Sequence, residues 1–193
     1  MEKTALVTGS PARVAEVAEA LEKLGFAVRS APDPEGLAAA CAELSPRSLR
    51  CYVQLPRDTE VEGPTLVERV RQFLAQGLLA RFDATTAVLP FLARDACVVL
   101  VAGNVPGAAT PDDRHARIDL LRVLARAILA ECADGDVRAV VVGYHRSAEE
   151  IAEIALNRGD VHGRRVAQVT ALPHDLTYDD WQREVLSLTT NEE

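Results

Sequence analysis

The sequence predicts an α/β fold, a doubly wound and mostly parallel sheet of about six strands, in one domain that spans residues 1–193. The first observation is an alternation of short, β-branched apolar segments with amphipathic helical segments along the chain. The second is a composition of 48% hydrophobic and 26% charged residues, which suits a single full core at this length. Because no repeat, low-complexity tract or linker divides the chain, we expect one domain.

The first 30 residues predict one βαβ unit. Residues 5–7 form an apolar strand, residues 8–11 a tight turn, and residues 12–24 a helix with one apolar face. A second strand follows at residues 26–29. The crossover of such a unit is right-handed, and the free N–H groups of its helix face the carboxyl edge of the sheet.

The rest of the chain continues the alternation of helix and strand. Further helices are expected at 35–44, 65–93 and 113–132, after Ser147, and in a short terminal segment from Leu176. Further strands are expected at 49–55, 96–102, 137–143 and 165–171.

The turn after the first strand carries a resemblance. Thr8 and Gly9 match the start of the T-G-x-x-x-G-x-G turn of the short-chain dehydrogenase/reductase family, whose other two glycine positions fall on Arg13 and Ala15. In a dinucleotide-binding fold the second glycine lets the backbone approach the pyrophosphate. Arg13 either occupies that approach or meets a phosphate as a cation, and the sequence leaves both readings open.

Two later stretches extend the resemblance. TTAVLPFL before the strand at 96–102, and LLRVLARAIL before the strand at 137–143, are similar to helices of this family. The D-P-E stretch at 33–35 normally follows the third strand of the family, whereas here it follows the second. The resemblance therefore implies a Rossmann-like sheet that lacks one helix and one strand.

The catalytic motif of the family is not found. The resemblance places its Y-x-x-x-K pair at Arg114 and Ile118, and its serine near Asn104. The reaction needs a tyrosine hydroxyl as acid and base, with a lysine ammonium beside it. The chain has only two lysines, Lys3 and Lys23, and both belong to the first βαβ unit. The resemblance thus implies a pseudoenzyme of this family.

The first functional hypothesis is a catalytically inactive protein that acts by association and needs no cofactor. In the resembled family the two long helices pair with their copies. We therefore expect a homodimer, or a hetero-oligomer with an active relative, through helices 65–93 and 113–132. Apolar residues outside the main stripes are candidates for the seam, including Leu79, Leu120 and Val123.

The second hypothesis is a nucleotide-sensing module. Its candidate cofactor-binding residues are Gly9, Ser10, Arg13 and Arg29. Arg29 lies at the expected end of the second strand, where a cation favours the 2′-phosphate of NADP over NAD. A third reading is an atypical NAD(P)-dependent reductase with relocated catalytic residues.

Other classes are disfavoured by composition and spacing. The formal charge of −8 and the lack of a clustered basic face argue against nucleic-acid binding. No apolar run is long enough to span a bilayer and no leader precedes the first strand, so the expectation is a cytoplasmic protein without membrane contact. The four cysteines and four histidines show no metal-ligand spacing. We expect the cysteines to be small core residues.

Overall fold

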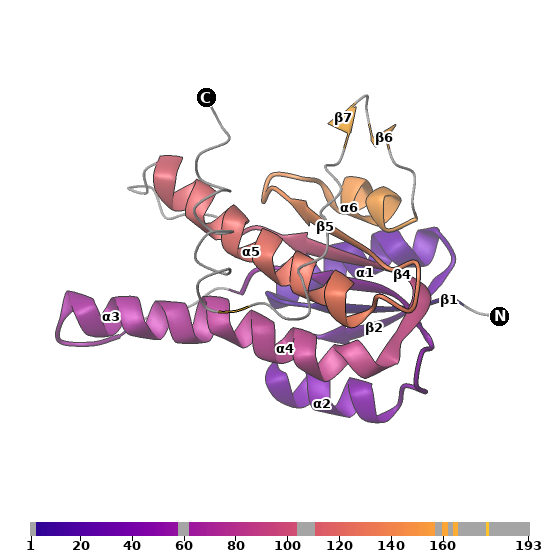
Figure 1. Ribbon diagram of the computed structural model, residues 1–193, viewed down its shortest axis with the longest axis horizontal. Helices are drawn as coiled ribbons and strands as arrows, with labels where there is room; N and C mark the ends of the chain where they lie inside the picture. Colours follow the sequence, from indigo (N-terminus) through magenta and orange to yellow (C-terminus); the bar gives the residue numbers. More distant parts are fainter. Residues whose placement is uncertain are drawn as a thin grey trace.

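The computed structural model describes residues 3–57, 62–103, 111–156, 160–161, 164–165 and 177, with the backbone alone for 111–116 and for the two short pairs near the end. Its centre is a parallel five-stranded sheet in the order β2-β1-β3-β4-β5 (Figure 1). The strands are β1 Lys3–Thr8, β2 Phe26–Ala31, β3 Leu49–Gln54, β4 Leu92–Val101 and β5 Arg138–Val142.

Helices cover both faces of this sheet, as the doubly wound prediction requires. α1 (Pro11–Lys23) and α6 (Ala148–Ala155) pack on one face. α2 (Pro34–Ala42), α4 (Ala80–Val88) and α5 (Pro111–Glu131) pack on the other. The predicted fold class is therefore confirmed.

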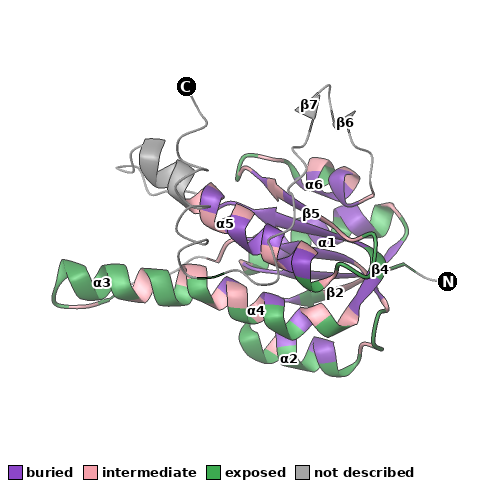
Figure 2. Ribbon diagram, viewed as in Figure 1, coloured by how far each residue is buried: buried purple, intermediate pink, exposed green. Residues whose placement is uncertain are grey.

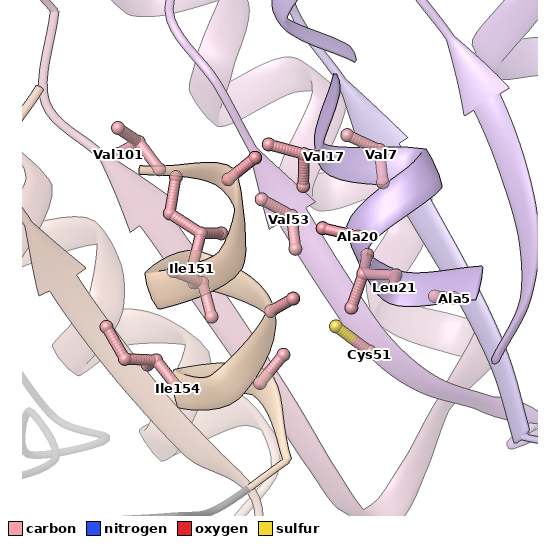
Figure 3. Close-up of a cluster of buried hydrophobic side chains, with 14 of the residues drawn as sticks. Ala5, Val7, Val17, Ala20, Leu21, Cys51, Val53, Val101, Ile151 and Ile154 are labelled. Carbon is pink, nitrogen blue, oxygen red and sulfur yellow. The ribbon is translucent and has the colours of Figure 1, made fainter. Parts of the chain in front are cut away.

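Two hydrophobic clusters fill the spaces between the sheet and its helices. Successive strand residues point to opposite faces, so Ala5 and Val7 join the α1–α6 cluster while Leu6 joins the other. Figure 3 shows the first cluster, in which Leu21 of α1 and Ile151 of α6 lie over the middle of the sheet. The core thus fixes both helix layers and, with them, the loops at the strand ends.

The strand order supports the expected shortening of the fold. The common doubly wound order is 3-2-1-4-5-6, and the observed sheet matches it with the outermost strand beside β2 removed. α2 leads into β3 and lies on the face of α4 and α5, where the sequence of D-P-E and alanine-rich helix placed it. One strand and its helix are therefore missing between β2 and α2.

The expected count of about six strands is reached only in part. Among the described residues the main sheet has five strands, and β6 (Asp160–Val161) and β7 (Arg164–Arg165) form a separate antiparallel pair. Most of the strand expected at 165–171 lies outside the described residues. The same is true of the terminal helix expected from Leu176.

The long helix expected at 65–93 has different bounds and a change of pitch. It begins as α3 (Leu66–Phe73), continues as a π-helical segment (η1, Leu74–Leu79) and then as α4, and ends in a 3₁₀ turn (η2, Leu89–Phe91). The prediction was wrong for Leu92 and Ala93, which are buried and open β4. Pro90 explains the end, because proline cannot donate the next helical hydrogen bond.

The carboxyl ends of all five strands share one edge of the sheet. From β1 the chain first moves outward to β2 and then returns to β3 on the other side, so the strand order reverses between β1 and β3. In open α/β sheets, ligands bind outside the carboxyl ends at such a point.

No helix in the described part of the chain is both long enough and apolar enough to cross a membrane.

Candidate functional site

The turn after β1 is packed tightly against the end of β3. Gly9 has φ +133°, and a Cβ on it would lie 2.6 Å from the Cβ of Leu55 and 2.7 Å from its carbonyl oxygen. The Leu55 N–H donates to the Thr8 carbonyl at 2.8 Å, and the Ser10 N–H donates to the Pro56 carbonyl at 3.0 Å. Glycine is therefore needed here both for its backbone angle and for the close approach of two chain segments.

Arg13 is engaged by protein partners. Its guanidinium pairs with Glu16 at 2.7 Å and donates a hydrogen bond to the carbonyl of Arg146, in the loop before α6. Its side chain is 26% exposed. Arg13 thus links the first turn of α1 to the β5–α6 loop. In a dinucleotide-binding turn, the second glycine leaves this place open for the pyrophosphate.

Arg29 also has a partner, and its place in the strand differs from the expected one. β2 continues to Ala31, so Arg29 is two residues short of the strand end. Its guanidinium pairs with Glu43, which follows α2 where the chain returns to the amino edge of the sheet. A nearby carboxylate therefore already compensates the charge that was expected to favour a 2′-phosphate.

A buried polar network lies where β3 and β4 end. Arg81, in the first turn of α4, is only 8% exposed. Its Nε donates to Oε1 of Gln54 at 2.8 Å, Nη2 to the Gln54 carbonyl at 3.0 Å, and Nη1 to the Val101 carbonyl at 2.9 Å. Arg81 therefore ties α4 to the carboxyl ends of two central strands.

Gln54 carries the network on toward β1. Its Nε2 lies 3.0 Å from the Tyr52 hydroxyl, 2.9 Å from the Arg81 carbonyl and 3.3 Å from Oγ1 of Thr85. The Tyr52 hydroxyl lies 3.3 Å from Oγ1 of Thr8. Apart from Arg81, every residue in these hydrogen bonds is neutral.

Burial shifts the titration of both ionisable members of the network. Loss of solvent lowers the pKa of Arg81 to about 10, with a smaller opposing effect from Tyr52. Loss of solvent raises the pKa of Tyr52, and the hydrogen bonds with Thr8 and Gln54 partly oppose it. At neutral pH the arginine is therefore cationic and the tyrosine neutral, so Tyr52 is poorly suited to act as a general base.

A small recess opens beside this network. It holds an accessible volume of about 20 Å³, and its lining includes Arg81, Gln54, Thr8, Arg57, Gln76 and Gly77. That volume admits roughly one water-sized group. We name it the Arg81 recess. A nicotinamide or adenine ring needs a far larger cavity.

The expected catalytic positions are described only in part. Lys23 pairs with Glu19 at 2.7 Å in the last turns of α1, and Lys3 opens β1, so both lysines lie toward the amino edge. The side chain of Arg114 and the whole of Asn104 lie outside the described residues. Ile118 packs against the α5 side of the core.

These residues do not fit a bound dinucleotide without rearrangement. A pyrophosphate at the start of α1 would have to displace Arg13 from Glu16 and from the Arg146 carbonyl. The Ser10 N–H is already bonded to Pro56. Gly9 and Ser10 still form the turn, and this turn packs against the end of β3 through Leu55 and Pro56.

The cysteines behave as small core residues. Cys41, Cys51 and Cys97 are buried and Cys132 is half-buried, all as free thiols. Burial raises the pKa of Cys97 to about 11, which disfavours the reactive thiolate. Within the described residues no group of histidine, cysteine and acidic side chains could hold a metal ion.

Sequence reasoning missed the network around Arg81. Two signals were available: Gln54 interrupts an otherwise apolar strand end, and Arg81 lies between apolar helix positions at Leu78 and Phe82. A polar residue at a position that the pattern assigns to the core needs hydrogen-bond partners. Which partners it finds depends on contacts between distant segments.

Comparison with known proteins identifies the fold. No family model matches the chain, and no curated protein matches it. A short-chain dehydrogenase/reductase variant from Serratia marcescens superposes with TM-score 0.59 at 15% identity, over 80% of this chain and 87% of that one. A putative member of the same family from Corynebacterium glutamicum gives TM-score 0.54 at 21% identity, over 89% of this chain and 100% of the other.

A third structure agrees. A putative short-chain dehydrogenase/reductase family oxidoreductase from Aeromonas hydrophila gives TM-score 0.53 at 15% identity, over 88% of this chain and 96% of the other. The chain has a short-chain dehydrogenase/reductase-like fold. At such identities the likeness concerns the fold, and the function of this chain has to be argued from its own residues.

Proposed function

We propose that this dehydrogenase-like chain acts by self-association, as a homodimer built on α3, and not by hydride transfer. The observation that carries the proposal is an exposed apolar stripe on α3 and η1. Leu66 is 67% exposed, Val67 78%, Val70 48% and Leu74 44%. An apolar patch of this kind on a soluble domain marks an interaction surface.

The stripe lies on a helix that extends past the sheet. Figures 1 and 2 show α3 projecting beyond the sheet, with most of its length exposed. None of its residues is buried. An amphipathic helix with no buried residue gains little from its own chain, and docking of its apolar face on a partner would stabilise it.

The polar side of α3 is already occupied by its own chain. Arg69 Nη1 donates to the Gly63 carbonyl at 3.2 Å, and the Glu62 N–H donates to Oε1 of Gln72 at 3.1 Å. Thr65 caps the helix by accepting from the Glu68 N–H at 3.2 Å. These contacts are local to the helix and the residues just before it, and they leave its apolar stripe exposed.

A second copy is the partner that this surface fits. Leu66, Val67, Val70 and Leu74 gather on one side of the helix at about 100° per residue, whereas Glu68 lies on the other side. In a two-fold antiparallel pairing centred near Val70, Val67 of each copy would lie toward Leu74 of the other. Such a surface is self-complementary, because the apolar residues of one copy meet the apolar residues of the other.

The second helix of the expected interface contributes less than the sequence indicated. From Arg117 to Ala130, no described side chain of α5 is exposed, and Val123 is only 6% exposed. Leu120 is half-buried, whereas Leu79 in η1 is 57% exposed. The proposal therefore keeps α3, η1 and Leu79 and omits α5.

Several features support the absence of hydride transfer. Both lysines lie toward the amino edge, and Arg13 bridges two segments across the phosphate approach. The nucleotide-sensing alternative has less support, because Arg13 and Arg29 each already pair with a carboxylate.

Sedimentation velocity of the Val70→Asp/Leu74→Asp double variant tests the proposal. The wild type should sediment as a dimer at tens of micromolar and the double variant as a monomer. Both positions are exposed, so the variant should keep its fold and its thermal midpoint.

The matched control is Tyr144→Asp, a side chain 46% exposed after β5 and outside the stripe on α3 and η1. It should remain dimeric. A monomeric wild type, or a double variant that stays dimeric, would contradict the proposal.

A further inference from the structure

Arg81 is a buried cation for which the described part of the chain provides no counter-ion. Its three hydrogen bonds reach two main-chain carbonyls and one amide oxygen, all neutral. No described carboxylate pairs with it, in contrast to Arg13, Arg29, Arg47 and Arg50, which each pair with one. Burial of an arginine charge without an opposite charge is costly, and folded proteins avoid it in most cases.

The Arg81 guanidinium keeps unused hydrogen-bonding capacity. A guanidinium carries five N–H donors in a planar fork that matches the oxygens of a carboxylate or phosphate. Three of these donors are engaged by Gln54 and Val101. Burial lowers the pKa of Arg81 only to about 10, so it remains charged at neutral pH.

Among the described residues, the lining of the recess beside Arg81 consists of donors and apolar groups. This described lining contains two arginines, Arg57 and Arg81, the amides of Gln54 and Gln76 and the Thr8 hydroxyl, and it includes no aspartate or glutamate. In a chain with a net charge of −8, such a concentration of positive and donor groups is distinctive. The positive potential is strongest where water is scarce.

The walls of the recess come from three separate parts of the fold. Thr8 ends β1 and Gly9 follows it, Gln54 ends β3 and Arg57 lies in the loop after it, and Gln76 and Gly77 belong to the π-helical segment η1, which continues into α4. π-helical turns often occur at functional sites. The site also adjoins the point where ligands bind in open α/β sheets.

We propose that the Arg81 recess binds a small oxyanion, a phosphate or carboxylate group, between Arg81 and Arg57. The volume of about 20 Å³ admits roughly one oxygen of the anion and leaves the remainder of the molecule in solvent. The anion supplies the charge that Arg81 lacks. This site is distinct from the dinucleotide phosphate approach at Arg13 and does not depend on the proposed dimer.

The test is an NMR titration of the ¹⁵N-labelled full chain with sodium phosphate, and separately with sodium acetate, at ionic strength held constant with sodium chloride. Saturable shifts should appear at the amides of Gly9 and Gly77, the side-chain amide of Gln54 and Nε of Arg81. Saturation with phosphate alone identifies a phosphoryl ligand, and saturation with acetate alone identifies a carboxylate.

Arg57→Gln and Arg94→Gln provide a matched pair that removes the same charge. Arg57 lines the recess, whereas the side chain of Arg94 is 70% exposed near the amino end of β4. Arg57→Gln should lower the affinity for the anion at least threefold, and Arg94→Gln should leave that affinity unchanged. This comparison needs no Arg81 variant, which would lose three buried hydrogen bonds and with them stability. Shifts that rise linearly with both anions, or equal effects of the two variants, would overturn the proposal.

Discussion

At the scale of single residues, two glycines with positive φ allow the cost of backbone strain to be measured apart from the cost of a steric clash. Gly9 has φ +133° and a Cβ would meet Leu55 at 2.6 Å, whereas Gly25 has φ +85° and nothing within 4 Å of that position. Gly25→Ala should therefore cost only backbone strain, about 1 kcal/mol. Gly9→Ala adds a clash with a neighbouring backbone and should cost about 3 kcal/mol.

Urea denaturation of the two variants measures the difference directly. A midpoint for Gly9→Ala well below that of Gly25→Ala is the expected result, with equal slopes. Equal losses in both variants would mean that the turn after β1 yields without cost, and that its contact with β3 has no structural role.

Single residues also show where sequence reasoning ends. Thr8 and Gly9 could be placed in a turn after a strand because local pattern and turn chemistry suffice. The partners of Arg13 could not be predicted, because the Arg146 carbonyl is 133 positions away in the chain. The partners of Arg81 could not be predicted either, because they lie on β3 and β4 and are set by tertiary packing.

The capping box of α6 makes a prediction at the scale of one element. The Ser147 hydroxyl accepts from the Glu150 N–H at 3.1 Å, while the Glu150 carboxylate accepts from the Ser147 N–H at 3.0 Å. Ser147→Ala should lower the free energy of unfolding by about 1 kcal/mol. Ser30→Ala, at an exposed position of β2, is the control and should change it by less than about 0.5 kcal/mol.

Chemical denaturation monitored by circular dichroism gives both values. The serine cap was expected from the sequence, because serine before two glutamates and an apolar helix is a strong start signal. If Ser147→Ala and Ser30→Ala are equally stable, the cap does not contribute to α6.

Element boundaries were predicted less well than element types. All five strands of the main sheet and the helices between them were expected, because each carries a periodic apolar pattern. The start of β4 at Leu92 was missed because apolar residues run without interruption from helix to strand. The π-helical segment η1 was also missed, since apolar periodicity does not distinguish it from an α-helix.

At the scale of the whole molecule, the fold and the proposed function rest on different observations. The parallel sheet follows from patterns along the chain, whereas the missing strand was implied by the resemblance to short-chain dehydrogenases/reductases. The exposed stripe of α3 could not be inferred in the same way. Its apolar residues look like core positions in the sequence, and only the structure shows that they lie beyond the sheet.

Native mass spectrometry of the purified chain, alone and with NAD(H) or NADP(H), tests the central claim most directly, because it reports assembly and nucleotide occupancy together. We predict a dimer of twice the chain mass that gains no nucleotide under either condition. A monomer, or a dimer that takes up one nucleotide per chain, would contradict a function based on self-association without a dinucleotide.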